Sequence, residues 1–366
     1  MIAFMSKIYT LDSLHVESLL SPSALKQQLP AAPMLMEFIS ESRRQISNIL
    51  NGTDPRLLLI VGPCSIHDIN AAEEYAVKLR HLSKDVSRSF FIVMRAYFEK
   101  PRTVTGWKGM LYDPHLDQTH DIASGIRHAR ELLLTLAKLE IPAATEFLDP
   151  VTPRYLGDLI SWACIGARTA ESQVHRQFAS GLAMPVAFKN STAGNIEVAV
   201  NGAKAAAHPH TGFGIDDNGQ ISIVHTKGNR DAHIALRGGE DGPNYHPEAI
   251  SSALAYLKKN HLPERIIIDC SHDNSFKQHE VQRTVFESVL DQYLQGNEAI
   301  RGLALESHLF GGNQRIPLDR SRLQYAVSIT DPCLDWENTE QLVRWADAMI
   351  ASKEAVAADE SKAKGS

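Results

Sequence analysis

The sequence predicts an α/β protein folded as a closed (β/α)₈ barrel, also called a TIM barrel. Eight short apolar runs are spaced along the 366 residues, and segments of helical spacing separate them. A strand that is buried on both faces reads as a continuous apolar run, and parallel strands of this kind need helical crossovers between them. Nearly every run ends in a charged or metal-binding side chain. Because the chemistry of this fold sits at the C-terminal ends of its strands, the pattern also predicts where the protein works.

The predicted strands are all short, and each is followed by a polar residue or a polar motif. Interior side chains of such a barrel fill it in layers, which favours bulky apolar residues in every strand. In chain order the strands are Leu57–Val61 before Gly62-Pro63-Cys64, Phe91–Met94 before Arg95, Ala143–Thr145 before Glu146, Cys164–Ala167 before Arg168, Pro185–Phe188 before Lys189, His233–Leu236 before Arg237, Arg265–Ile268 before Asp269, and Gly302–Leu305 before Glu306.

The first helical pattern lies at Met34–Leu50, before the first strand, and Gly52 is placed to end that helix. This helix is not part of the eightfold repeat. The helices expected to cover the barrel span about 70–85, 121–139, 153–163, 171–182, 195–207, 246–260, 275–296 and 338–352.

Segments outside a minimal barrel define the predicted domain organisation. Residues 1–50 form an N-terminal extension, for which we expect a role in regulation or oligomerisation, and residues 51–354 form the catalytic barrel. A β-hairpin is expected at about 208–228, because Asn218-Gly219 is flanked by alternating apolar residues. The long segment Glu99–His120 is expected to be a binding loop, and the tail 355–366 is expected to be disordered.

Composition and charge exclude several classes of protein. The formal net charge is −6, so no basic surface indicates nucleic acid or an anionic membrane as a partner. The first residues lack the pattern of a signal peptide, and no apolar run approaches the ~18 residues that span a bilayer. Four cysteines in a chain of this length do not indicate a disulfide framework. We therefore expect a cytoplasmic protein.

Four metal-binding side chains follow strands that a closed barrel brings together. Cys64 follows the first strand, His272 follows the seventh, Glu306 ends the eighth and Asp331 lies just beyond it. One thiolate, one imidazole and two carboxylates suit a divalent transition ion better than magnesium, which prefers oxygen ligands. We expect one ion of manganese, iron, cobalt or zinc. Taken singly, each residue has a structural alternative, such as a buried apolar thiol for Cys64 or a helix cap for Asp331.

Cationic side chains gather on the same predicted face. Arginine binds carboxylate or phosphate through two parallel hydrogen bonds. The alternative is that each cation pairs with an acid of the protein, but Glu146 and Asp149 are expected to neutralise only two, so we predict bound anions, most simply two phosphates and a carboxylate. A Schiff base between Lys189 and a carbonyl substrate is a further alternative, although it leaves the metal without a purpose. The cations are Arg95, Lys100, Arg102, Arg168, Lys189 and Arg237.

The motifs around this predicted face are long enough to be specific. The first four are Gly62-Pro-Cys-Ser-Ile-His-Asp68, Met94-Arg-Ala-Tyr-Phe-Glu-Lys-Pro-Arg-Thr103, Gly106-Trp-Lys-Gly109 and Ile165-Gly-Ala-Arg-Thr-Ala-Glu-Ser-Gln-Val-His-Arg176. The others are Leu236-Arg-Gly-Gly239, Cys270-Ser-His-Asp-Asn-Ser275, Leu305-Glu-Ser-His308 and Ser328-Ile-Thr-Asp-Pro-Cys333. Over about residues 35–350 the chain resembles class I 3-deoxy-D-arabino-heptulosonate 7-phosphate (DAHP) synthase. The extension and the hairpin resemble its feedback-regulated branch.

The resemblance implies a metal-dependent, aldol-like condensation of phosphoenolpyruvate with D-erythrose 4-phosphate and water. The products are DAHP and phosphate, in the first step of the shikimate pathway to aromatic amino acids. It implies that one divalent metal ion is held by Cys64, His272, Glu306 and Asp331. It assigns phosphoenolpyruvate to Arg95, Lys100, Ala167, Arg168, Lys189 and Arg237, and erythrose 4-phosphate to Lys100, Pro101, Arg102 and Thr103.

Proton transfer and regulation follow from the same resemblance as expectations. Lys100 is expected to donate a proton to the nascent alkoxide, because nearby cations and a metal would lower its pKa. Glu146 or His272 is expected to activate the attacking water. The resembling branch is inhibited by phenylalanine, tyrosine or tryptophan, and small residues at Ala183 and Gly214 near the hairpin favour tyrosine. A homodimer or homotetramer is expected.

The chain departs from the family in the loop after the fifth strand. The family has Lys-Asn-Gly-Thr-Asp-Gly where this chain has Lys189-Asn-Ser-Thr-Ala-Gly194, so Ser191 and Ala193 differ, and Ala170 replaces a common threonine. Two rival functions remain. A related synthase that uses arabinose 5-phosphate resembles Lys-Ala-Asn-Arg where this chain has Lys100-Pro-Arg-Thr103. A non-catalytic, amino-acid-sensing barrel would have lost metal ligands, and all four are present.

Overall fold

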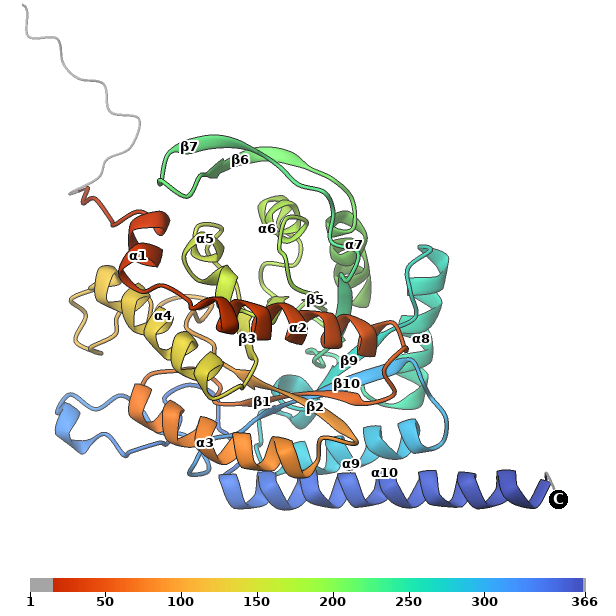
Figure 1. The fold of residues 1–366 in the computed structure, drawn as a ribbon. Helices are drawn as coiled ribbons and strands as arrows, with labels where there is room; N and C mark the ends of the chain where they lie inside the picture. The colour runs from red at the N-terminus through yellow and green to blue at the C-terminus, as the bar shows by residue number, and fades with distance from the viewer. Residues whose placement is uncertain (1–15, 365–366) are drawn as a thin grey trace, which may run out of the picture.

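The computed structural model describes residues 16–364, with the backbone alone from residue 356 onward. Its centre is a closed barrel of eight parallel strands in the order β1-β2-β3-β4-β5-β8-β9-β10, and β10 pairs back onto β1 (Figure 1). The predicted (β/α)₈ barrel is therefore confirmed. The strands are β1 (Leu57–Gly62), β2 (Phe90–Arg95), β3 (Ala143–Glu146), β4 (Trp162–Ile165), β5 (Val186–Lys189), β8 (His233–Leu236), β9 (Ile266–Asp269) and β10 (Ile300–Glu306).

Most of the described helices lie within a few residues of their predicted bounds. Side-chain caps explain where several begin: the Asp68 carboxylate accepts from the Ala71 N–H at the start of α3, and the Ser172 hydroxyl accepts from the His175 N–H at the start of α6. The helices are α1 (Pro22–Gln28), α2 (Pro33–Leu50), α3 (Ile69–Asp85), α4 (Ile122–Lys138), α5 (Thr152–Leu156), α6 (Gln173–Ala179), α7 (Ile196–Ala206), α8 (Pro247–Lys259), α9 (Val281–Leu294) and α10 (Trp336–Lys364).

Alternate residues of each strand fill the barrel interior. Leu58 and Ile60 of β1 belong to the interior cluster, whereas Leu59 packs in the larger cluster between the strands and the surrounding helices. Ile46 and Ile49 of α2 join the interior cluster. The N-terminal helix α2 therefore closes the barrel at the end where the strands begin, and it leaves the opposite end, the mouth, for the site.

Two elements of the barrel wall end earlier than the sequence predicts. The fourth strand, predicted at 164–167, lies at Trp162–Ile165, because the Gly166 carbonyl accepts the N–H groups of Thr169 and Ala170 and so begins a turn. Arg168 lies in that turn and not directly at the strand end. Helix α5 ends at Leu156 because a 3₁₀ turn at Gly157–Leu159 follows it.

The C-terminal tail corrects another prediction. Residues 355–364, expected to be disordered, continue α10 to Lys364. This segment contains alanine, glutamate and lysine, which are strong helix formers, and it contains no glycine or proline before Gly365. Its polar composition therefore does not end the helix, and residues 365–366 lie outside the described range.

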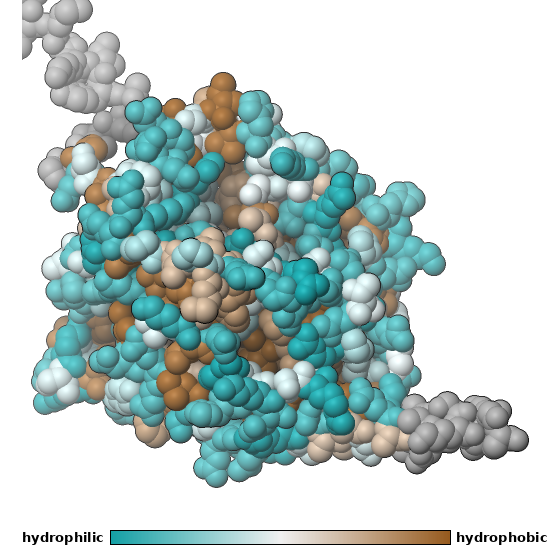
Figure 2. Space-filling model, viewed as in Figure 1, coloured by the Kyte–Doolittle hydropathy of each residue, from teal (hydrophilic) through white to brown (hydrophobic). Residues whose placement is uncertain are grey.

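The hairpin of β6 (Thr211–Ile215) and β7 (Ile221–His225) lies inside the predicted segment 208–228. It arches over α5, α6 and α7, and apolar surface is visible on it in the space-filling view (Figures 1 and 2). Phe213 is 93% exposed, Ile221 is 85% exposed and Ile223 is 69% exposed. The Ser23 N–H of α1 donates to the Asp217 carbonyl at the hairpin tip, at 2.7 Å, so the extension and the hairpin touch.

Among the described helices, none is both long and apolar enough to cross a membrane.

Candidate functional site

Three of the four predicted metal ligands converge at the barrel mouth. One ligand atom each from Cys64, Glu306 and Asp331 lies within 4.8 Å of the others. Barrel closure brings Cys64 and Glu306 together, because Gly62 of β1 is paired with Glu306 of β10. The Cys64 side chain and Glu306 are buried, and Asp331 is half-buried.

Contacts between two loops place Asp331 beside Cys64. The Ser65 and Thr330 hydroxyls lie 2.7 Å apart, and the Cys64 N–H donates to the Cys333 sulfur at 3.4 Å. The segment that follows β10 is thereby held against the loop that follows β1. This explains how a carboxylate from beyond the last strand reaches a thiol near the first.

His272, the fourth predicted ligand, lies beside this group but outside it. Its Nε2 is 3.8 Å from Glu306 Oε1, and its Nδ1 is 3.0 Å from Asp269 Oδ2. A carboxylate that holds one ring nitrogen of a histidine commonly orients the other nitrogen toward a metal. Asp269 is buried in this position, and it was not among the predicted site residues, although its place at the end of β9 was visible in the sequence.

The donor group already surrounds a positive charge, which is a test of whether it suits a cation. Lys100 Nζ lies 3.1 Å from Cys64 Sγ and 3.0 Å from the Cys64 carbonyl oxygen. Burial opposes the charge of Lys100, but Cys64, Glu306 and Asp331 outweigh it and raise the pKa of Lys100 above its ordinary value. The predicted lowering of this pKa assumes a bound metal ion, and in the protein without one the acids around Lys100 raise it. One thiol and two carboxylates around an ammonium fit a divalent transition ion.

Three of the predicted anion-binding cations are paired with acids of the protein. Arg95 lies 2.9 Å from Glu306 Oε1, and both side chains are 1% exposed. Lys189 lies 3.1 Å from Asp269 Oδ2, and Arg237 contacts Asp273. The expectation that acidic partners are too few is therefore wrong. The partners are not Glu146 and Asp149, because they come from β9, β10 and the turn after β9.

Arg168 and Arg102 are not neutralised in this way. Both are exposed, and no carboxylate in the described part of the chain pairs with either guanidinium. Arg168 Nε donates to the Thr103 hydroxyl at 3.2 Å, and Arg102 Nε donates to the Trp107 carbonyl at 2.8 Å. The turn after β4, which also holds the half-buried Ala167, therefore meets the loop after β2.

Glu146 ends β3 and presents a free oxygen. Its Oε1 is buried without a hydrogen-bond partner, and its Oε2 lies 4.0 Å from Cys164 Sγ. A Cβ at Gly166 would lie 2.3 Å from Glu146 Oε1, so the glycine leaves the space that this carboxylate occupies. An unpartnered buried carboxylate oxygen is a candidate acceptor for a proton or for bound water.

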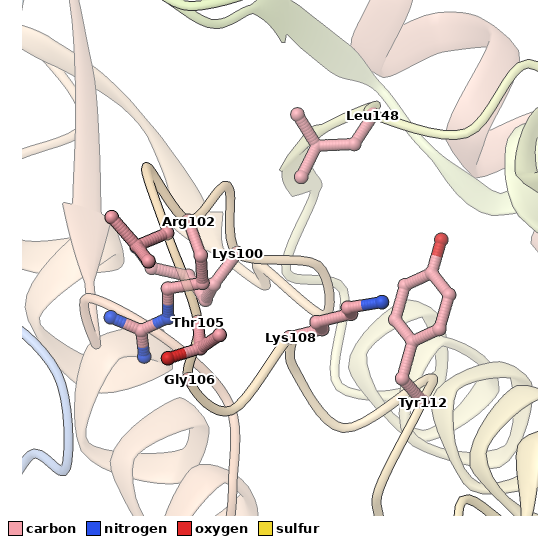
Figure 3. A pocket seen from close by; sticks show the side chains of 8 residues that line it. Lys100, Arg102, Thr105, Gly106, Lys108, Tyr112 and Leu148 are labelled. Carbon is pink, nitrogen blue, oxygen red and sulfur yellow. The ribbon is translucent and has the colours of Figure 1, made fainter.

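The loop after β2 forms a pocket of about 160 Å³ beside Lys100. Arg102 and Lys108 extend from this loop, Lys108 Nζ lies 5.9 Å from the centre of the Tyr112 ring, and Leu148 comes from the loop after β3 (Figure 3). Glu99 joins the two loops, because its buried carboxylate accepts from the N–H groups of Leu148 and Asp149. Burial raises the pKa of Glu99 to about 8.

Comparison with known proteins identifies the family. The profile of the DAHP synthetase I family matches residues 29–344. The Tyr-sensitive phospho-2-dehydro-3-deoxyheptonate aldolase of Escherichia coli K12 is 47% identical over 91% of this chain and 94% of its own. The Trp-sensitive enzyme of the same organism is 48% identical over 93% of this chain and 97% of its own.

A solved structure of the same enzyme type extends the comparison to the fold. The structure of phospho-2-dehydro-3-deoxyheptonate aldolase from Francisella tularensis SCHU S4 superposes with a TM-score of 0.91. It is 42% identical and covers 93% of this chain and 99% of its own. With a matching profile, near-complete relatives and this barrel mouth, the chain belongs to the DAHP synthetase I family and is an enzyme of the DAHP synthase type.

Proposed function

We propose that the barrel mouth condenses phosphoenolpyruvate with D-erythrose 4-phosphate and water, giving DAHP and inorganic phosphate. A bond forms between C3 of phosphoenolpyruvate and the aldehyde carbon, water oxygen adds at C2, and phosphate leaves from C2. The observation that carries this proposal is the group of Cys64, Glu306 and Asp331 within 4.8 Å, set beside buried cations and a free Glu146 oxygen. The family and the names of the relatives support the reaction.

Phosphoenolpyruvate is assigned to the buried cations of the mouth. Arg95, Lys189 and Arg237 each hold a carboxylate of the protein, and the phosphate and carboxylate of the substrate offer the same kind of oxygen. Arg168, which pairs with no described carboxylate, adds a further donor fork beside Ala167. Fixing the substrate on these groups supplies part of the rate enhancement.

Erythrose 4-phosphate is assigned to the pocket beside Lys100. Arg102 and Lys108 line it, and Thr103 lies next to Arg168. The proposal assigns the sugar phosphate to Lys100, Pro101, Arg102 and Thr103, with its aldehyde toward the metal ligands. The alternative substrate, arabinose 5-phosphate, is longer by one carbon.

One divalent ion is assigned to Cys64, Glu306 and Asp331, with His272 as the fourth ligand. The thiol and the imidazole favour manganese, iron, cobalt or zinc over magnesium. When bound, such an ion supplies a Lewis acid for the aldehyde oxygen. Burial raises the pKa of the Cys64 thiol to about 11 in the protein alone, so binding of the ion should release a proton.

Proton transfer is assigned to two side chains. In the protein without metal, the acids around Lys100 raise its pKa, and this ammonium is the side chain assigned to donate a proton to the nascent alkoxide. Glu146 is preferred to His272 for the attacking water, because both ring nitrogens of His272 already face Asp269 and Glu306, whereas Glu146 Oε1 has no partner.

Regulation by an aromatic amino acid is part of the proposal, with tyrosine favoured. The Tyr- and Trp-sensitive names of the relatives support the class of inhibitor. The exposed Phe213, Ile221 and Ile223 support an oligomer, a homodimer or homotetramer, that covers the hairpin. The proposed location is the cytoplasm.

Phosphate release tests the reaction directly. The purified enzyme is assayed with phosphoenolpyruvate plus erythrose 4-phosphate, with arabinose 5-phosphate in its place, and with EDTA added to the first mixture. We expect phosphate release in the first mixture alone. Equal rates with the two aldose phosphates, or no release with either one, would contradict the proposal.

A further inference from the structure

Three of the cations at the barrel mouth share one aromatic neighbour. The Tyr97 ring lies under the Arg95 guanidinium carbon at 4.1 Å, Lys189 Nζ at 5.9 Å and Lys100 Nζ at 6.0 Å, each measured to the ring centroid. These cations come from β2, from β5 and from the loop after β2. No other described aromatic ring lies beneath more than one cation within comparable distance.

The fold fixes the Tyr97 ring at both of its ends. Tyr97 follows the last residue of β2 by two positions, and its carbonyl accepts from the Ile66 N–H at 2.9 Å. Its hydroxyl lies 3.2 Å from Cys164 Sγ on β4, so the side chain reaches across the mouth. Tyr97 is 2% exposed, and burial raises its pKa well above the ordinary value, so the hydroxyl stays neutral.

A shared ring stabilises neighbouring cations without occupying the donors that a substrate needs. Like charges in a poorly solvated site repel one another, and the acids that hold these cations by direct contact are Glu306 for Arg95 and Asp269 for Lys189. A substrate that binds these cations competes with those acids. The negative face of an aromatic ring attracts cations without competing for their N–H donors in the same way, and the attraction grows when the site is desolvated.

We propose that Tyr97 is a positioning residue for phosphoenolpyruvate, whose ring face holds Arg95, Lys100 and Lys189 in the arrangement that binds the substrate. This inference rests on the proposed function, because it assumes that these cations bind phosphoenolpyruvate. Its particular content is that the electron density of the ring matters, and that the hydroxyl and the volume of the side chain matter less.

A series of ring substitutions separates these contributions. Tyr97→Phe removes the hydroxyl and keeps the ring, and it should change the Kd of phosphoenolpyruvate by less than about threefold. Phenylalanine analogues with one, two, three and five ring fluorines at position 97 keep nearly the same shape while they weaken the negative face. We expect the Kd to rise with each step, by about tenfold over the series. Tyr97→Leu removes the ring, and we expect the largest loss, about thirtyfold.

Binding, kinetics and thermal stability together distinguish a positioning role of Tyr97 from a packing role. Calorimetric titration of phosphoenolpyruvate gives Kd for the metal-loaded enzyme, and kinetics give KM and kcat. We expect the fluorinated series to raise Kd and KM together while Tm stays constant. The same analogues at Phe90, a buried ring at the opposite end of β2, should leave Kd unchanged.

The outcomes distinguish this inference from the proposed function. A flat Kd across the fluorinated series, with Lys189→Ala still weakening phosphoenolpyruvate, would overturn the role of Tyr97 alone. No effect of Lys189→Ala would overturn the assignment of the substrate to these cations. A progressive rise in Kd at position 97 that is absent at position 90 would support the inference even if Tyr97→Leu fails to fold.

Discussion

Buried cations occur at both ends of the barrel, and their partners differ. Where the strands begin, Arg265 donates to the carbonyls of Arg230 and Ala232 and to the Asn51 side chain, and it lies 3.6 Å from Asp231. Where the strands end, Arg95 and Lys189 are held mainly by carboxylates. All three of these cations are buried, because Arg265, Arg95 and Lys189 are each less than 5% exposed.

The difference between these partners supports the proposal that ligands bind where the strands end. A backbone carbonyl is fixed by the chain and carries a partial charge, so an arginine bound to several carbonyls contributes to stability. A carboxylate carries a full charge that a substrate anion can replace. Removal of one partner from a buried pair leaves an uncompensated charge, and a substrate can supply that compensation. In barrels of this kind the C-terminal ends of the strands carry the catalytic residues, and the opposite end contributes to stability.

The largest expected effect is the loss of a metal ligand at the mouth. Asp331→Asn should lower kcat/KM by about 10⁴-fold, because an amide is a poorer ligand and the Lewis acid contributes several kcal/mol. Phosphate release and bound metal per chain check it. Asp335→Asn is the matched control, because Asp335 accepts from the Asn338 N–H at the start of α10 and lies outside the site. Full activity in Asp331→Asn would remove this residue from the ligand set.

Acid should lower the stability of the protein by protonating His233, which lies at the end of the barrel where the strands begin. Burial and then Arg265 lower the pKa of His233 to about 3, and its Nε2 accepts from the Trp162 indole N–H. Because the folded pKa lies below the unfolded value, the stabilisation is present above about pH 6.5 and is lost as pH falls toward 3, in total roughly 5 kcal/mol.

Urea unfolding at several pH values measures this effect. His233→Gln retains a neutral donor and acceptor, so we expect its free energy of unfolding to fall less between pH 6.5 and 4 than that of the parent protein. Part of the fall should remain, because burial also lowers the pKa of His308 to about 3. Identical pH dependence in the two proteins would contradict the assignment.

Removal of the cation itself at the closed end should change stability and leave kinetics intact. Arg265→Met should lower the free energy of unfolding by about 3 kcal/mol, because the carbonyls of Arg230 and Ala232 lose a buried donor. Denaturant unfolding and steady-state kinetics check both parts. Arg283→Met, at an exposed pair with Glu287 on α9, should cost less than about 0.5 kcal/mol. A raised KM in Arg265→Met would contradict a purely structural role for this arginine.

The corresponding change at the mouth should alter the kinetics. Lys189→Ala should raise the KM for phosphoenolpyruvate and lower turnover, by about fiftyfold in kcat/KM, because a charge-assisted contact is lost. Lys204→Ala, on the exposed face of α7, should leave both constants unchanged. Kinetics of Lys189→Ala that match the parent enzyme would exclude this lysine from the site.

The last expected effect is oxidation of two cysteines, which a reductant should reverse. Air should prevent added metal from restoring activity to the metal-free protein, by joining Cys64 to Cys333, whose sulfur lies 3.4 Å from the Cys64 backbone nitrogen. Titration of unfolded protein should find four thiols before aeration and two afterwards. Cys333→Ser should resist inactivation. Four thiols after aeration would count against this pairing.

Much of the barrel was predictable from the sequence, because each strand is a continuous apolar run followed by polar residues. The same pattern placed Cys64, Glu306 and Asp331 on one rim, since parallel strands end at the same edge. Spacing along a chain does not say which neighbour a side chain chooses, however. The pairing of Lys189 with Asp269 was missed for this reason.

Other features depended on contacts between side chains from different strands. The raised pKa of Lys100 results from acids that come from three separate segments. The position of Tyr97 beneath three cations depends on how β2 and β5 curve around the barrel, and its sequence neighbours did not indicate this arrangement. The helical tail was missed because polar composition was given more weight than helix propensity.

The pairing of β1 with β10 has a consequence for synthesis of the protein. A ribosome produces the thiol of residue 64 long before the carboxylates of residues 306 and 331. A nascent chain therefore has no complete ion-binding group until most of its length has emerged, and truncated products lack it altogether. Under the proposed ligand assignment, loading with metal is in this way restricted to molecules whose barrel has closed.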